Sequence, residues 1–251
     1  MKRILTAVLF TTTALLLLLP SAFGQSPASL TREDVLKEIL TKRAELQALE
    51  EQFLTPSNED RTAYAEFLRQ PHTGLIRLLP REVYESDSFK KNRKTMTIRG
   101  GGAYYSFGLL THEYGYGSDI ELQQGNLQVG FAGADYGMLT NLGDVPLEEI
   151  VLEHASVRSL VEYKVPAEEP QARLEARRFR AGTEIDNVAY KSQLPVAVNR
   201  TYLLRSINYN DYDVTVAFRI VRKDSDGSII IAWKLLKKNP KPRLARNETK
   251  P

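Results

Sequence analysis

The sequence predicts an α+β fold in which an N-terminal helix pair packs on a mainly antiparallel, twisted β-sheet. Three observations support this class. Apolar residues recur at helical spacing before residue 70, glycines and tyrosines concentrate among short strand-like runs in residues 100–143, and alternating apolar residues fill the C-terminal third. The content of 42% hydrophobic and 26% charged residues is that of a globular protein.

Residues 1–24 have the pattern of a secretory signal peptide. Lys2 and Arg3 precede a largely apolar stretch, and small residues at Ala22 and Gly24 suit cleavage before Gln25. The apolar stretch of 16 residues is shorter than the roughly 20 that span a bilayer, so no transmembrane span is expected after cleavage. We therefore expect an exported protein, periplasmic or secreted, and the absence of cysteine favours a bacterial envelope.

Charge and composition exclude several functional classes. The chain has no cysteine, which rules out thiol nucleophiles, disulfides and thiolate metal sites. Residues 25–233 hold 25 basic and 30 acidic residues, which argues against a nucleic-acid-binding face. The basic, proline-containing segment 239–251 predicts a disordered tail, with an anionic envelope polymer as its partner.

The segment 25–72 predicts a helical hairpin. Thr31 with Asp34 has the spacing of a capping box, and Ser57 with Asp60 repeats this start signal after the first helix. The first helix, residues 31–53, should run for about six turns. Its apolar residues are expected at helical spacing, namely Val35, Leu36, Ile39, Leu40, Leu46, Leu49 and Phe53.

This apolar stripe has two interpretations. It packs against the sheet, or it joins two copies of the chain into a homo-oligomer. In the second case the molecular mass measured in solution depends on the protein concentration. Leu40→Glu or Leu46→Glu would then reduce this measured mass. We favour packing against the sheet, because that is the commoner use of such a stripe.

The segment 73–238 predicts a β-rich domain. The strand candidates are residues 95–98, 103–110, 120–122, 127–131, 202–208, 212–222 and 228–237. Asp226-Gly227 is a turn signal between the last two strands, whose alternating residues form one apolar face. Residues 165–170, which include two prolines, predict an exposed connector.

Residues 111–119 contain most of the chemically active side chains. The candidate catalytic residues are His112, Glu113, Asp119 and Asp135. The imidazole would act as a general base oriented by a carboxylate, or would bind a metal with the two aspartates. The tyrosines that would shape the pocket are Tyr105, Tyr114 and Tyr116. The alternative is structural, with the aspartates closing turns and the imidazole satisfied inside the fold, and we favour it.

No motif in the chain assigns an activity, since it contains no GxSxG elbow, P-loop, HExxH or EF-hand sequence, and we predict no cofactor. We favour a non-catalytic binding or structural protein of the envelope. One alternative is a periplasmic hydrolase or metal-assisted enzyme that uses the His112–Asp119 segment. Another is a protein that self-associates through the 31–53 helix. An enzyme requires the polar groups to converge in a concavity, whereas a binding domain allows them to point apart.

Overall fold

The computed structural model describes residues 31–82, 96, 98–112, 114–115, 117–131 and 133–245. Residue contacts divide the chain into two units, residues 1–42 and 43–251, and the boundary lies inside helix α1 (Arg32–Leu54). The predicted signal peptide lies outside the described residues. Within the described part, no helix combines the length and the apolar character needed to cross a bilayer.

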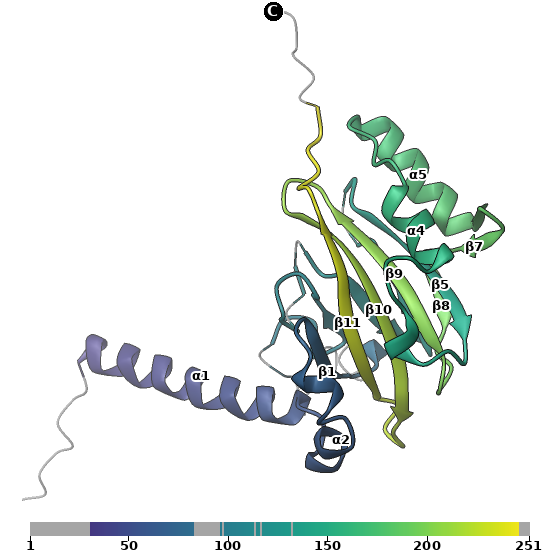
Figure 1. Cartoon of the computed structure of the whole chain (residues 1–251). Helices are drawn as coiled ribbons and strands as arrows, with labels where there is room; N and C mark the ends of the chain where they lie inside the picture. The colour runs from purple at the N-terminus through teal and green to yellow at the C-terminus, as the bar shows by residue number, and fades with distance from the viewer. Residues whose placement is uncertain are drawn as a thin grey trace, which may run out of the picture. The chain divides into compact units, whose positions relative to one another are not determined.

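A five-stranded antiparallel sheet, the central sheet, lies at the middle of the second unit (Figure 1). Its strands follow the order β1-β11-β10-β9-β5. Their bounds are β1 (Thr73–Leu78), β5 (Tyr136–Gly143), β9 (Thr201–Asn208), β10 (Tyr212–Lys223) and β11 (Ile229–Asn239). The predicted α+β class with a mainly antiparallel sheet is confirmed.

One face of the central sheet is covered by a second antiparallel sheet, the small sheet, whose strand order is β2-β3-β4-β8. Its strands are β2 (Tyr104–Tyr105), β3 (Ile120–Gln123), β4 (Asn126–Gln128) and β8 (Gln193–Pro195). The two sheets share an apolar core that includes Leu122, Leu127, Phe218 and Ile231. Since strand residues alternate between faces, the other side chains of the small sheet point away from this core.

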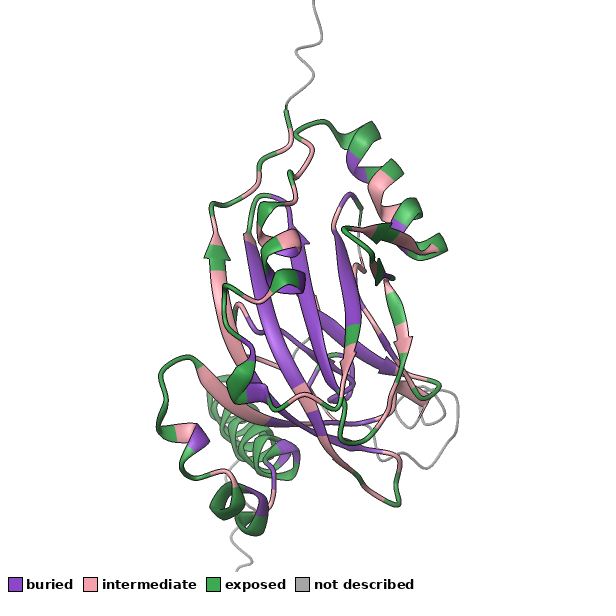
Figure 2. Cartoon of the chain, turned by 45° about the vertical axis from the view of Figure 1, so that its right-hand side comes forward, coloured by how far each residue is buried: buried purple, intermediate pink, exposed green. Residues whose placement is uncertain are grey.

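The opposite face of the central sheet is covered by helical segments, as Figure 1 shows for α4 and α5. The elements are η2 (Leu147–Glu149), α4 (Ala155–Glu162), α5 (Glu169–Ala181) and the hairpin of β6 (Thr183–Ile185) and β7 (Val188–Tyr190). Leu160 and Phe179 pack there with Leu203 and Ile207. Because both faces are covered, all eight residues of β9 are buried (Figure 2).

The two predicted helix starts are present. Thr31 Oγ1 accepts a hydrogen bond of 3.1 Å from Asp34 N, and Ser57 caps α2 (Asn58–Ala63) in the same way. Leu54 of α1 and Phe67 of η1 (Phe67–Arg69), which both belong to the second unit, are buried in its apolar clusters. The other large apolar side chains of α1 are exposed.

Three segments differ from the sequence expectation. Residues 165–168 of the expected connector do join α4 to α5 without regular structure, but Glu169 and Pro170 already form the first turn of α5. Met96 and Ile98 are not in a strand, and residues 95 and 97 lie outside the described part of the chain. Residues 240–245 of the predicted tail form two backbone hydrogen bonds with the body, from Asn210 N to Pro242 O (2.8 Å) and from Ala245 N to Ala167 O (2.7 Å).

Candidate functional site

His112 directly follows Thr111, which forms an isolated antiparallel β-bridge with Ser106, and its ring points toward Arg77 of β1. Its Nε2 lies 2.9 Å from the carbonyl oxygen of Arg77. Because a carbonyl oxygen only accepts, Nε2 carries the proton and donates, which leaves Nδ1 of the neutral ring with an unshared lone pair. Burial lowers the pKa of His112 and so favours this neutral form. His112 therefore offers a hydrogen-bond acceptor rather than a positive charge.

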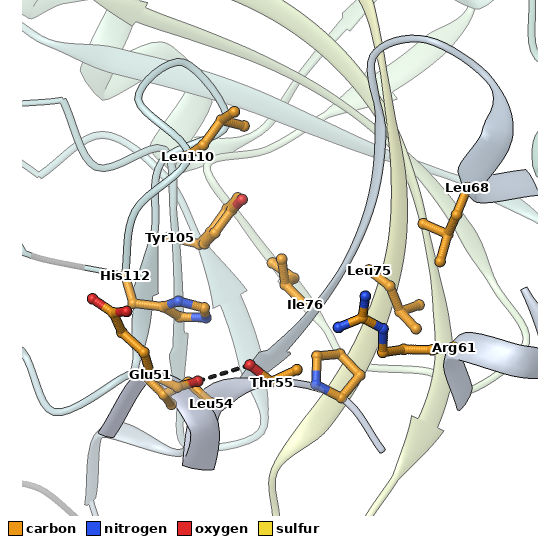
Figure 3. A pocket seen from close by; sticks show the side chains of 11 residues that line it. Glu51, Leu54, Thr55, Arg61, Leu68, Leu75, Ile76, Tyr105, Leu110 and His112 are labelled. Atoms are coloured by element: carbon orange, nitrogen blue, oxygen red, sulfur yellow. Dashed lines mark hydrogen bonds between the residues drawn. The ribbon is translucent and has the colours of Figure 1, made fainter. Parts of the chain in front are cut away.

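A cavity of about 390 Å³, the His112 cavity, lies beside this ring (Figure 3). Its apolar wall is formed by Leu54, Pro56, Leu68, Leu75, Ile76 and Leu110. Its polar lining consists of Glu51, Thr55, Arg61, Tyr105 and His112. Figure 3 shows Tyr105 and His112 on one side of the cavity and Arg61 with Leu75 on the other. The volume falls within the range of small-molecule sites, which is roughly 300–1,000 Å³.

Two polar groups on this lining have no competing partner in the described part of the chain. Arg61 is exposed and forms no ion pair there. The hydroxyl of Tyr105 forms no hydrogen bond there either, and burial raises the pKa of Tyr105, so this hydroxyl stays protonated as a donor. The cavity thus combines a cation, the carboxylate of Glu51, a donor and an acceptor with an apolar wall.

Asp119 lies in a different setting, fully buried between the two sheets. Its Oδ2 accepts hydrogen bonds from the backbone nitrogens of Phe107 (2.7 Å) and Gly108 (3.2 Å). Its Oδ1 accepts from Asn208 Nδ2 (3.1 Å) and lies 3.1 Å from the hydroxyl of Tyr212. Asp119 therefore positions the loop of residues 106–111, because its buried carboxylate accepts hydrogen bonds from the backbone of that loop.

This loop forms part of the rim of the His112 cavity. Leu110 is 63% exposed and has a φ of +57°, a left-handed conformation that a leucine adopts only when its surroundings impose it. The hydrogen bond from Leu110 N to Ser106 O (2.8 Å) and the bonds of Asp119 impose that conformation. A residue held in a sparsely populated backbone conformation beside a cavity is typical of functional sites such as ligand clamps.

Asp119 is also expected to make the stability of the fold depend on pH. Burial raises the pKa of Asp119 from 3.8 to about 6. The native state then binds more protons than the unfolded state between about pH 4 and pH 6, so the free energy of unfolding falls as the pH rises through this range, by up to about 3 kcal/mol. Asp119→Asn cannot ionise and should flatten this part of the profile in urea titrations. Equal slopes in both proteins would contradict the assignment.

Asp135 and Glu113 complete the set of candidate residues. Asp135 Oδ1 accepts a hydrogen bond of 2.8 Å from Tyr209 N, and its side chain lines another cavity, between β4 and α5. Glu113 lies outside the described residues, as does Tyr116. No hydrogen bond between described residues joins His112, Asp119 and Asp135. The structure thus distributes the grouped candidates over three separate settings.

Sequence reasoning did not find the rest of the His112 cavity. Arg61, Leu75 and Leu68 come from α2, β1 and η1, between 37 and 51 residues before His112. Arg61 lies in a short polar helix, where an arginine has no pattern that distinguishes it from a solvated one. Among the described residues, no three His, Asp or Glu side chains are grouped closely enough to hold a metal ion.

Comparison with known proteins assigns no family to the chain. No family model matches it, and neither a curated protein nor a solved structure is similar to it.

Proposed function

We propose that this chain is an exported, non-catalytic binding domain whose His112 cavity takes a small organic acid with an apolar body. The observation that carries the proposal is the cavity lining, in which Arg61, without an ion pair among the described residues, and two neutral hydrogen-bonding groups face an apolar wall. Glu51, the acidic residue of the lining, is exposed and accepts a hydrogen bond of 3.0 Å from Gln47 Nε2. Export is supported by the signal-peptide pattern of residues 1–24.

The lining suggests how such a ligand would be oriented. Arg61 would pair with the carboxylate, since a guanidinium matches carboxylate geometry. The alkyl body would lie on Leu75 and Ile76, and a hydroxyl or other donor on the ligand would reach Nδ1 of His112. Leu110 would close over the apolar part.

Decanoate is a suitable probe of this site, with decyltrimethylammonium as a cation of the same chain length. Calorimetric titration of the wild-type protein should give binding of decanoate and weaker binding of the cation. Arg61→Gln should weaken decanoate binding about tenfold, because it removes one charge-assisted contact.

Arg69→Gln is the matched control, since Arg69 is also exposed but lies outside the cavity lining. It should leave the affinity for decanoate unchanged. If Arg61→Gln binds decanoate as tightly as the wild type, or if both arginine variants weaken it equally, the cavity is not the binding site.

A hydrolase centred on His112 is the second candidate. It is favoured by one observation, the unshared Nδ1 lone pair beside the hydroxyl-bearing ring of Tyr105, whose centroid lies 4.9 Å from that of His112. Asp119 does not support this candidate, because its carboxylate is fully buried and is engaged by its own chain. Turnover of p-nitrophenyl decanoate that is abolished by His112→Gln would favour the enzyme over the binding domain.

Self-association through α1 stays a prediction. Leu46, Leu49 and Phe53 are 42%, 63% and 50% exposed, so the second half of the helix retains apolar surface. Self-association would be supported if the molecular mass in solution rises with concentration for the wild type and is lower for Leu46→Glu at the same concentration. The anionic polymer proposed for the basic tail likewise stays a prediction, and Lys241 and Arg243 are exposed.

A further inference from the structure

The outer face of the small sheet, which points away from the core, presents a row of polar and aromatic side chains. The strand register pairs Tyr104 with Glu121, Glu121 with Gln128, and Gln128 with Gln193. Directly paired residues of antiparallel strands lie on the same face, so these four side chains form one row across the sheet. The neighbouring row of Leu122, Leu127 and Leu194 packs into the core.

One end of the row forms an aromatic cavity of about 260 Å³. The Tyr104 ring lies between Tyr114 and Phe131, at centroid distances of 4.5 Å and 5.5 Å. Glu121 is 2% exposed and accepts a 2.8 Å bond from Arg81 Nη1. The aromatic rings and this ion pair, whose carboxylate is buried, build a preorganised site rather than an incidental surface hollow.

The other end of the row opens into a polar cavity of about 390 Å³. Phe131 lines this cavity as well as the aromatic one, so a single ring is common to both. Gln128, Gln193 and Asp135 contribute amide and carboxylate groups, and Arg180 of α5 lies at the side. Gln128 Nε2 donates to Gln123 Oε1 (2.8 Å), which leaves its own oxygen as an acceptor.

Two arginine side chains on this lining have no ion-pair partner among the described residues. Arg99 lines the aromatic cavity and Arg180 lines the polar one, and neither forms an ion pair with any described residue. Both are exposed. A ligand that spans the two cavities would therefore meet one unpaired positive charge in each.

We propose that this outer face binds a chain of acidic sugars, with consecutive uronic acid residues in the two cavities and the Phe131 ring between them. Tyr114, which is 36% exposed, and the partly exposed Phe131 offer apolar ring surfaces to the C–H faces of the sugar rings, and the buried Tyr104 ring supports them. The side-chain amides and carboxylates match the paired hydroxyls, which both donate and accept. Arg99 and Arg180 supply the charge complement of the sugar carboxylates. A neutral saccharide would use the rings and amides but would leave both arginines unpaired.

The proposal is tested by calorimetric titration of the full chain with tetragalacturonate and with its fully methyl-esterified form. The ester keeps the sugar backbone and removes the charge. The wild-type protein should bind the acid about tenfold or more tightly than the ester. Similar affinities for acid and ester would overturn the acidic class. No binding of either, or tighter binding of a thymidine oligonucleotide, would overturn the saccharide site.

Variants of the lining locate the site. Phe131→Ala should weaken binding of acid and ester alike by about tenfold, because both use the ring. Arg180→Gln should weaken the acid about fivefold and leave the ester unchanged, whereas Arg177→Gln, an exposed arginine of the same helix outside the lining, should change neither. Full affinity in Phe131→Ala and in Arg180→Gln would overturn the location.

The result is separable from that of the His112 cavity. The two sites share no lining residue. Phe131→Ala should therefore leave decanoate binding unchanged, and Arg61→Gln should leave tetragalacturonate binding unchanged.

Discussion

Asp213→Ala is expected to lower the free energy of unfolding by about 3–5 kcal/mol. Asp213 and Arg205 form a two-point ion pair, with 2.9 Å from Nε to Oδ1 and 2.7 Å from Nη2 to Oδ2. The side chains are 2% and 4% exposed, so the variant would leave a buried guanidinium without its counter-charge. Removing one partner of a buried pair costs far more than the pair contributes.

Arg205 also joins the central sheet to α4. Its Nη1 donates to the carbonyl oxygens of Leu160 and Tyr163, at the C-terminal end of that helix, where a positive charge is favourable. Loss of Asp213 would free Arg205 to move and would loosen α4. We therefore expect the loss of stability to be accompanied by faster hydrogen exchange in α4 than in β11.

The exposed pair of Glu169 and Arg173 is the control. Arg173 Nη2 lies 2.6 Å from Glu169 Oε1, but both side chains are about half exposed, at 51% for Arg173 and 50% for Glu169. Glu169→Gln should cost about 0.5 kcal/mol or less in urea titrations. If Asp213→Ala lowers the free energy of unfolding by no more than Glu169→Gln does, Arg205 does not form the buried ion pair with Asp213 that the structure describes. Replacing the pair by Arg205→Met with Asp213→Leu should cost less than Asp213→Ala alone.

Gly130→Ala is expected to destabilise the fold by about 3 kcal/mol. Gly130 has a φ of +80°, and a Cβ atom there would lie 2.8 Å from the Cα of Tyr136 and 3.2 Å from the nitrogen of Gly137. These are backbone atoms of β5, which is fixed by its pairing with β9. A paired strand cannot move aside as a flexible side chain could. The cost of the left-handed backbone conformation and the cost of the steric overlap with β5 therefore add in the free energy of unfolding.

Gly125→Ala separates these two causes. Gly125 has a φ of +69° and no atom within 4 Å of the added Cβ, so only the conformational cost of about 1 kcal/mol applies. Thermal unfolding should show a drop for Gly130→Ala that is about three times that for Gly125→Ala. An equal drop in both would mean that Gly130 does not approach β5 as closely as described.

The C-terminal strands were predictable because their local signals agree. Alternating apolar residues and the Asp226-Gly227 turn placed β10 and β11 within two residues of their observed bounds. The alternation also predicted the face of Val216 and Phe218 that packs against the small sheet. Local pattern and tertiary packing impose the same period of two on these strands.

Other elements were not predictable because their local signals are weak. Helix α5 buries only Ala172 and Phe179, so its apolar spacing is too sparse to stand out from its charged residues. Strand β5 contains Gly137, where a Cβ would come within 3.0 Å of Arg205 O. The close approach of the two backbones requires glycine there, so the segment lacks the β-branched residues by which a strand is usually predicted.

The sequence by itself determined the fold class, the helix caps and the C-terminal strands, because each depends on contacts between near neighbours. The sites were decided by the tertiary structure alone. His112 and Asp119 are seven residues apart, yet one faces a cavity built by Arg61 and Leu75 and the other is buried between two sheets. The physical reason is that strand pairing and loop closure, not sequence distance, select which distant side chains meet.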